Sequence, residues 1–306
     1  MMKEIPSLHI ILPGGGVRGC FQGGFLYTLL NEYADKFHIH RVDGTSVGAL
    51  NGLAFVLNQK DSIYTLWHNI KCIEDIFDDW ISVPYFKTVA QSYRFLSEYG
   101  FYGNQSLQRI IEGIKDQGST EPSAPSPTNT TSETLLSRYH CVVTDVHQGC
   151  HRYIPGTDPE LCNYVLASAS PWIITSPLTI GDGLYTDGGL LHPNPTDYMD
   201  TEDCDLTVVV GFDSDTMTST NQESFSSAVG YLSHLIDMVR AQLPNRTHLG
   251  EAGLETTDGA KKICIKNPLQ IHFLEFDQNA IREGFMQGEA EAHNFAKQYL
   301  GVSPPS

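Results

Sequence analysis

The sequence predicts an α/β protein with a largely parallel sheet, and three observations lead to that class. Two runs of strand length, an apolar one at residues 8–12 and a second at 38–42, each pass through a glycine-rich turn into a segment with helical spacing. A third run, 206–212, is apolar almost throughout, which is typical of a strand covered on both faces. The chain has 306 residues, of which 41% are hydrophobic, so it can bury a sizeable core. Repeated strand, turn and helix units favour parallel pairing.

The remaining elements follow from the same patterns. Helical spacing continues over residues 17–30 and 49–57, and the segment 61–115 is helical in tendency. Two apolar runs on either side of Gly149 predict a hairpin. The elements expected later in the chain are strands at 139–144, 151–154, 206–212 and near 271–276, and helices at 161–168, 224–243 and 280–300.

We expect a single domain over residues 1–306, with the motifs in 8–212 and a C-terminal part of helices and a strand in 213–306. Residues 117–134 are mostly Ser, Thr, Pro, Gly, Asn and Glu, which predicts a flexible surface loop. The aromatic cluster at 80–86 predicts a packed helical cap, with a lipid-contacting lid as the alternative.

Charge and cysteine content exclude several classes of protein. The formal net charge of −17 would repel nucleic acid, and an anionic bilayer would hold the protein only through a local apolar or basic patch. The sequence has no signal-peptide core and no run of ~20 apolar residues, which predicts a cytoplasmic protein with peripheral membrane contact at most. The seven cysteines include no C-x-x-C pair, which favours reduced thiols over disulfides or a zinc site.

The turn after the first strand is rich in glycine. It reads Gly-Gly-Gly-Val-Arg-Gly over residues 14–19 and leads into the first helix. Backbone N–H groups and a helix N-terminus gathered at one point attract a phosphate or an oxyanion. The letters also satisfy the G-x-G-x-x-G pattern, and Asp43 closes the second strand where a dinucleotide-binding fold holds its ribose carboxylate. A dinucleotide-dependent oxidoreductase is therefore one alternative.

Two further turns carry candidate catalytic residues. Residues 44–48 form a G-x-S-x-G motif between a strand and a helix, where Ser46 would expose its hydroxyl on a sharp turn. The glycines on either side let such a turn close without steric conflict. Asp187 precedes a pair of glycines, a pattern that by itself indicates only a turn.

Taken in order, these three motifs resemble the patatin-like phospholipase family, which is marked by a glycine-rich loop, a G-x-S-x-G elbow and a later D-G-[GA] turn. The small residues and prolines of 167–177, ahead of Asp187, are also similar to that family. The resemblance implies a three-layer α/β/α sandwich that hydrolyses acyl esters of a lipid without metal or cofactor. It implies Ser46 as nucleophile, Asp187 as general base, and the N–H groups of Gly15, Gly16 and Val47 as an oxyanion hole. Carried over to this chain, the loop positions are Gly14, Gly15, Gly16, Arg18, Gly19 and Val47, and the supporting glycines are Gly44, Gly48, Gly188 and Gly189.

Several alternatives remain open at this point. An aspartate with an ordinary pKa near ~3.9 is a weak base at neutral pH, so a Ser-Asp dyad depends on burial of the carboxyl or on the oxyanion donors. A Ser-His-Asp triad would draw on one of the twelve histidines. Acyl transfer in place of hydrolysis, a catalytically silent lipid-binding protein and any oligomeric state are also compatible with the motifs. The other residues considered are His192, His234, His248 and His293 as triad members, Ser168 and Ser170 as packing residues, and Cys20 as a helix-start thiol.

Overall fold

The computed structural model describes residues 5–78, 100–120, 132–199, 203–212, 253–257, 260–267, 273–274 and 276–302. The aromatic cluster at 80–86 and the helix expected over 224–243 lie outside these residues, as do His234 and His248. The expectation of a single domain stays a prediction.

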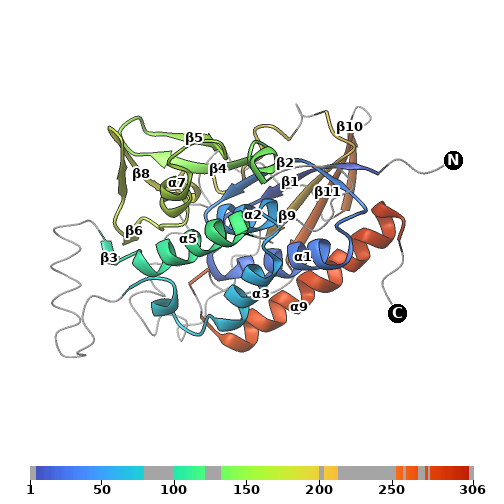
Figure 1. Cartoon of the computed structure of the whole chain (residues 1–306), viewed down its shortest axis with the longest axis horizontal. Helices are drawn as coiled ribbons and strands as arrows, with labels where there is room; N and C mark the ends of the chain where they lie inside the picture. The colour runs from blue at the N-terminus through green and yellow to red at the C-terminus, as the bar shows by residue number, and fades with distance from the viewer. Residues whose placement is uncertain are drawn as a thin grey trace.

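The centre of the molecule is a nine-stranded mixed sheet within the described residues (Figure 1). Its order is β10-β11-β9-β1-β2-β4-β8-β7, with β5 paired to β4. The strands β11, β9, β1, β2 and β4 run parallel, and antiparallel pairs lie at both ends. The bounds are β1 Ser7–Leu12, β2 His38–Thr45, β4 Tyr139–Asp145, β5 Cys150–Pro155, β7 Leu178–Ile180, β8 Gly183–Asp187, β9 Leu206–Phe212, β10 Gly253–Thr257 and β11 Ala260–Asn267, with β3 Gly100–Tyr102 and β6 Ile173–Thr175 forming a separate pair.

Helices flank this sheet, which confirms the α/β/α class. In Figure 1, α1, α3 and α9 lie side by side below the sheet, and α2 packs between them and β2. The helices are α1 Gly19–Glu32, α2 Val47–Val56, α3 Lys60–Asn69, α5 Gln105–Thr120, α6 Ser132–Leu136, α7 Leu161–Ser168 and α9 Gln278–Phe295, with short turns η1 Gly16–Arg18, η2 Ile73–Asp75, η3 Gly188–Leu190 and η5 Ala296–Leu300.

The parallel centre of the sheet decides where a site can form. Strand β1 lies between β2 and β9, and all seven residues of β9 are buried. In the β1–β2 register Leu12 faces Gly44, so the turns after these two strands leave the same edge of the sheet. Because ligands of parallel sheets bind at the carboxyl ends of the strands, this edge is where the motifs are expected to act.

Most elements expected from the sequence are confirmed. The strand at 206–212 and the helix at 161–168 have the expected bounds, and β4 and β5 form the hairpin around Gly149. The helix expected at 280–300 begins at Gln278 and ends as a π-helical turn.

Two expectations are wrong in part. Residues 273 and 274 form a turn and no strand, because the carbonyl oxygen of Phe273 accepts a hydrogen bond from the Val17 N–H group and its side chain lines a pocket. The strand of this region is β11, which extends the sheet beside β9. Within the loop expected over 117–134, residues 117–120 belong to α5 and residues 132–134 to α6, and residues 121–131 lie outside the described residues.

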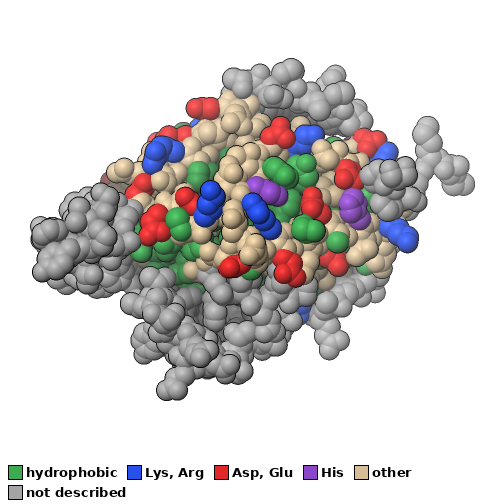
Figure 2. Space-filling view, turned by 90° about the horizontal axis from the view of Figure 1, so that it is seen from below, with side chains coloured by type: hydrophobic (Ala, Val, Ile, Leu, Met, Phe, Trp, Pro, Cys, Tyr) green, Lys and Arg blue, Asp and Glu red, His purple; other side chains and the backbone are tan. Residues whose placement is uncertain are grey.

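No helix among the described residues is long and apolar enough to cross a membrane. Figure 2 shows one face of the molecule, with acidic, basic and histidine side chains interspersed with small apolar areas. Tyr64 on α3 and Met286 on α9 are among the few large hydrophobic side chains that are exposed. Scattered apolar groups of this kind are ordinary for a protein surface.

Candidate active site

The turn between β2 and α2 holds Ser46 in an unusual backbone conformation. Its φ is 56° and its ψ is −126°, a region that side chains other than glycine rarely adopt. The chain is also crowded here: a Cβ on Gly44 would meet the carbonyl oxygen of Gly48, and a Cβ on Gly48 would meet that of Leu12. Only glycine fits at either position, and the sharp turn presents the serine hydroxyl at the edge of the sheet.

The Ser46 hydroxyl donates a hydrogen bond to Asp187. The distance from Ser46 Oγ to Asp187 Oδ2 is 2.7 Å, and both residues are buried. Asp187 ends β8, opposite Val143 of β4, and its other oxygen, Oδ1, accepts from the Gly189 N–H group at 2.6 Å. The turn at Gly188 is close-packed, because a Cβ there would meet the carbonyl oxygen of Val142. The two motifs, far apart in the sequence, therefore meet at one point.

The glycine-rich loop after β1 lies against this pair. The ideal Cβ position of Gly14 is 3.0 Å from Ser46 Cβ, and Gly16 has a φ of +58°. The Gly14 N–H group donates to the carbonyl oxygen of Pro193 at 2.9 Å, so it is not available to a ligand. The N–H groups of Gly15 and Gly16 have no acceptor within the described part of the chain. These two groups, rather than that of Gly14, can bind an oxyanion.

Arg18 supports the same loop from one side. Its Nε donates to the carbonyl oxygen of Gly15 at 3.2 Å, and its guanidinium carbon lies 5.4 Å from the centre of the Phe212 ring. Gly19 begins α1 and packs against Val47, the first residue of α2, so closely that a Cβ would meet the valine side chain. The starts of the two helices are thereby held together beside Ser46.

Ser168 has a contact that sequence reasoning missed. Its hydroxyl accepts a hydrogen bond from the Ser46 N–H group at 2.9 Å and donates to the carbonyl oxygen of Val142 at 2.6 Å. Ser170, by contrast, donates within its own helix end to Leu166. The expected role of both serines was close packing, and no local pattern separates them. Ser168 fixes the backbone of the strained residue.

His192 and His293, two candidate triad members among the described residues, have their contacts away from the Ser46 hydroxyl. His192 Nε2 lies 3.1 Å from the Tyr153 hydroxyl and 3.1 Å from Asp197, and burial of its ring lowers the pKa of His192 to about 4. His293 on α9 is bonded to the Tyr33 hydroxyl. Among the described residues, the acceptor found at the Ser46 hydroxyl is therefore a carboxylate and not an imidazole.

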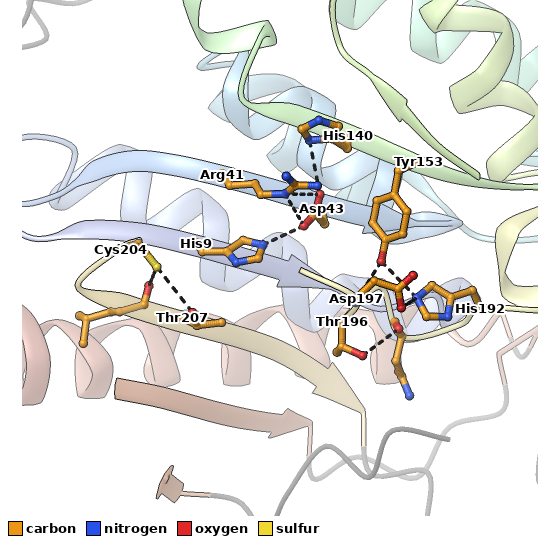
Figure 3. A network of polar contacts seen from close by, with 12 residues as sticks. His9, Arg41, Asp43, His140, Tyr153, His192, Thr196, Asp197, Cys204 and Thr207 are labelled. Carbon is orange, nitrogen blue, oxygen red and sulfur yellow. Dashed lines mark hydrogen bonds and ion pairs between the residues drawn. The ribbon is translucent and has the colours of Figure 1, made fainter. Parts of the chain in front are cut away.

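Asp43 is not available for a ribose. The residue is fully buried, and its carboxylate accepts from His9 Nε2 at 2.8 Å and from Arg41 Nε at 2.8 Å (Figure 3). His140 lies 3.4 Å from the same carboxylate. The dinucleotide alternative thus loses the carboxylate that would bind the ribose.

Cys20 is an ordinary core residue. Burial raises the pKa of its thiol to about 12, so the thiol is not a reactive group at the start of the helix.

An apolar pocket opens beside the serine. Its cavity volume is about 60 Å³. Its walls come from η1, from the start of α2, from α3 and the segment after it, and from α5. Ala169, Pro171 and three residues near the start of α9 complete them. The lining consists of Gly16, Val17, Ser46, Val47, Leu50, Leu66, Trp67, Ile70, Ile76, Phe77, Leu107, Ala169, Pro171, Phe273, Leu274 and Phe276.

These features define an α/β protein with a buried serine and carboxylate beside an apolar pocket. A family model described as patatin-like phospholipase matches residues 10–200, more than half of the chain, so the chain belongs to the patatin-like phospholipase family. Members of this family are lipid hydrolases. The crystal structure of VipD from Legionella pneumophila is similar at 12% identity, over 94% of this chain and 67% of that chain, with a TM-score of 0.36. No curated protein matches the sequence.

Proposed function

We propose that this chain is a serine lipid acyl hydrolase of the phospholipase A or lysophospholipase type that uses a Ser46–Asp187 dyad. The observation that carries the proposal is the 2.7 Å hydrogen bond from the Ser46 hydroxyl to Asp187 at the wall of an apolar pocket. A buried hydroxyl that donates to a carboxylate is prepared to lose its proton as it attacks.

The reaction would proceed through an acyl-enzyme. Ser46 Oγ attacks the ester carbonyl carbon while its proton passes to Asp187 Oδ2. As the tetrahedral intermediate collapses, the leaving alcohol takes that proton and the acyl group stays on the serine. Water then attacks the acyl-enzyme, gives its proton to Asp187, and releases a fatty acid, after which the proton returns to Ser46. The Gly189 N–H group donates to the other carboxylate oxygen, Oδ1, throughout, so Oδ2 stays oriented toward the serine hydroxyl.

Negative charge on the intermediate would be stabilised by backbone donors. The N–H groups of Gly15 and Gly16 have no acceptor among the described residues, and that of Val47 stands at the N-terminus of α2. Oriented N–H groups and a helix N-terminus stabilise an oxyanion without reorganisation. Because Arg18 and Pro193 bond to the backbone of the loop, they would hold the donors in place.

The pocket favours an acyl chain as its occupant. Apart from Ser46, its lining consists of apolar side chains and one glycine, and the described lining includes no charged residue. Burying a methylene group contributes roughly 0.8 kcal/mol, so an acyl chain gains affinity for each methylene group that the pocket encloses. The ester carbonyl at the head of the chain would then lie beside Ser46. Hydrolysis in place of transfer to another alcohol follows if water reaches the acyl-enzyme.

The test is fatty acid release from phospholipid vesicles and hydrolysis of a short-chain p-nitrophenyl ester. We expect Ser46→Ala to abolish both activities, and Asp187→Asn to lower them by ~10²–10⁴-fold, the usual contribution of a positioned base. A fluorophosphonate probe should label the native protein and not Ser46→Ala.

The chain offers an exposed aspartate and an exposed serine as matched controls. Asp182 is exposed in the turn before β8, and Ser137 is exposed after α6, so Asp182→Asn and Ser137→Ala should retain full activity. Labelling without any lipid hydrolysis would keep the nucleophile and reject the substrate class. A folded native protein with no labelling and no turnover would indicate the silent lipid-binding alternative.

A further inference from the structure

A second cluster of reactive side chains lies apart from the Ser46 hydroxyl. It consists of His151 on β5 and of His192 and Asp197, which follow the η3 turn. The imidazole rings of the two histidines are stacked, with their centres 4.2 Å apart and their planes 13° from parallel. The three candidate ligand atoms all lie within 4.8 Å of one another.

The aspartate joins the two rings. His151 Nε2 lies 2.8 Å from Asp197 Oδ2, and His192 Nε2 lies 3.1 Å from Oδ1 (His192 and Asp197 are shown in Figure 3). Two ligand atoms bound to one tetrahedral zinc ion at ~2.0–2.1 Å are about 3.4 Å apart. The three ligand atoms are therefore close enough together for one ion, and the stacked rings would have to turn so that both Nε2 atoms point at it.

We propose that these residues bind one divalent transition metal ion of the zinc class. Two imidazoles and one carboxylate are ligands that zinc accepts, and water would take the fourth position. About 29% of the His151 side chain and 42% of the Asp197 side chain are exposed, so the ion and its water can enter from solvent. No local sequence pattern indicates this site, because His151 is separated from the other two ligands by some forty residues.

The two ring nitrogens of His192 have different surroundings. Its Nδ1 is buried without a partner among the described residues, so either neutral tautomer leaves one polar atom unmet there. The choice of tautomer therefore depends on Nε2, which faces Asp197 and the Tyr153 hydroxyl. A cation at Nε2 satisfies the ring nitrogen and the carboxylate together, with the ring proton on Nδ1.

The bound ion would link β5 to the segment that supports the catalytic loops. In that segment Pro193 accepts the hydrogen bond of the Gly14 N–H group, and the carbonyl oxygen of His192 accepts one from the Thr45 hydroxyl at 3.2 Å. The metal is a structural crosslink in this arrangement and takes no part in ester cleavage. Its occupancy would stabilise the fold around the site.

The experiment uses the untagged full chain, stripped of metal and titrated with Zn²⁺ or Co²⁺ alone. We expect one ion per chain, a rise in Tm with added Zn²⁺, and visible Co²⁺ absorption without a thiolate charge-transfer band. His151→Ala and Asp197→Asn should each weaken binding by ~10-fold or more and remove the rise in Tm. His147→Gln, in the exposed turn between β4 and β5, is the matched control and should bind as the native chain does.

The result is independent of catalysis. Ser46→Ala should bind the ion with unchanged affinity, so a failure of the proposed hydrolase does not decide the metal site. Equal Zn²⁺ affinity in the native chain and in both folded variants would overturn the proposal. A thiolate band would also overturn it, because the ligands would then be cysteines. Absence of binding by the native chain would also overturn it, and the cluster would then be a hydrogen bond between His151 and Asp197 with the His192 ring beside it.

Discussion

The turn after β1 and the turn after β2 leave neighbouring strands at the same edge of the sheet and have nearly the same positive φ at one residue. Gly16 has a φ of +58° and Ser46 a φ of 56°. Glycine adopts this region at no steric cost, whereas for serine it costs roughly 1–3 kcal/mol. The first turn offers backbone N–H groups and needs no side chain. The second must present a hydroxyl, and it carries strain for that reason.

The surroundings of the two turns differ accordingly. Around Ser46 the backbone is fixed by the hydrogen bond to Ser168 and by the close approach of β2, α2 and Leu12. Around Gly16 the loop is held by hydrogen bonds between Gly14 and Pro193 and between Val17 and Phe273. A strained residue persists where its surroundings determine it completely. Changes at the second turn should therefore cost more than changes at the first.

The largest effect is expected from Gly48→Ala, which breaks the second turn. The new Cβ would meet the carbonyl oxygen of Leu12, a backbone atom that cannot move aside cheaply. We expect a loss of roughly 1–3 kcal/mol in the free energy of unfolding and activity close to that of Ser46→Ala. Gly113 in α5 is the matched control, since a Cβ there meets no atom within 4 Å. Gly113→Ala should raise the free energy of unfolding by roughly 0.5–1 kcal/mol. If chemical denaturation showed no change in that free energy for Gly48→Ala, the turn could relax around the new Cβ.

A smaller effect is expected from Gly16→Ala at the first turn. The substitution forces a positive φ on alanine and brings its Cβ against the carbonyl oxygen of Phe273, so the N–H donors would shift. We expect activity to fall by ~10²–10³-fold, the usual loss when an oxyanion donor is removed.

The control for this change is Gly181→Ala. Gly181 has a φ of +57° in a turn where a Cβ would meet no atom within 4 Å, so it carries the conformational cost alone. Both variants should lose roughly 1–2 kcal/mol of stability from the backbone conformation, and only Gly16→Ala should lose activity. Equal activity of the two on the p-nitrophenyl ester would reject an oxyanion role for this loop.

The strand, turn and helix units around both turns could be predicted from the sequence because the information is local. Apolar runs such as 206–212 indicate a strand covered on both faces, and the structure has β9 at those residues. The run at 271–276 is also mostly apolar, yet the Phe273 carbonyl oxygen accepts a hydrogen bond from the first turn and its side chain lines the pocket. At 273–274 tertiary contacts override the local apolar pattern, and these contacts cannot be predicted from the residues of the run itself.

The candidate site shows the same division between local and tertiary information. Ser46 and Asp187 stood out by their glycine-rich turns, and the structure brings them to 2.7 Å. Ser168 could not be distinguished from Ser170, because its partner is set by the packing of α7 against β4 and not by its neighbours. Pro193 likewise accepts the hydrogen bond of the Gly14 N–H group through a contact between distant segments, which leaves Gly15 and Gly16 as the candidate donors of this loop.

The smallest effect on activity is expected from Ser168→Ala. This substitution removes a hydrogen bond that holds the second turn and adds no atom to it. The Ser46 N–H group would lose its acceptor inside the protein, which costs roughly 1–3 kcal/mol. We expect about a tenfold fall in kcat, because a shift of the backbone misaligns the hydroxyl with Asp187, and little change in KM, because the pocket is untouched.

Ser170→Ala is the control for this last change. Ser170 is also buried, and its hydroxyl donates to Leu166 rather than to the turn, so its loss should lower stability by a comparable amount while kcat is retained. The two variants therefore separate support of the elbow from general packing. If both lowered kcat equally, Ser168 would be a packing residue, and the strain at Ser46 would be held by the glycines on either side. If Ser168→Thr also restored the rate, the hydroxyl itself would be identified as the group that fixes the nucleophile.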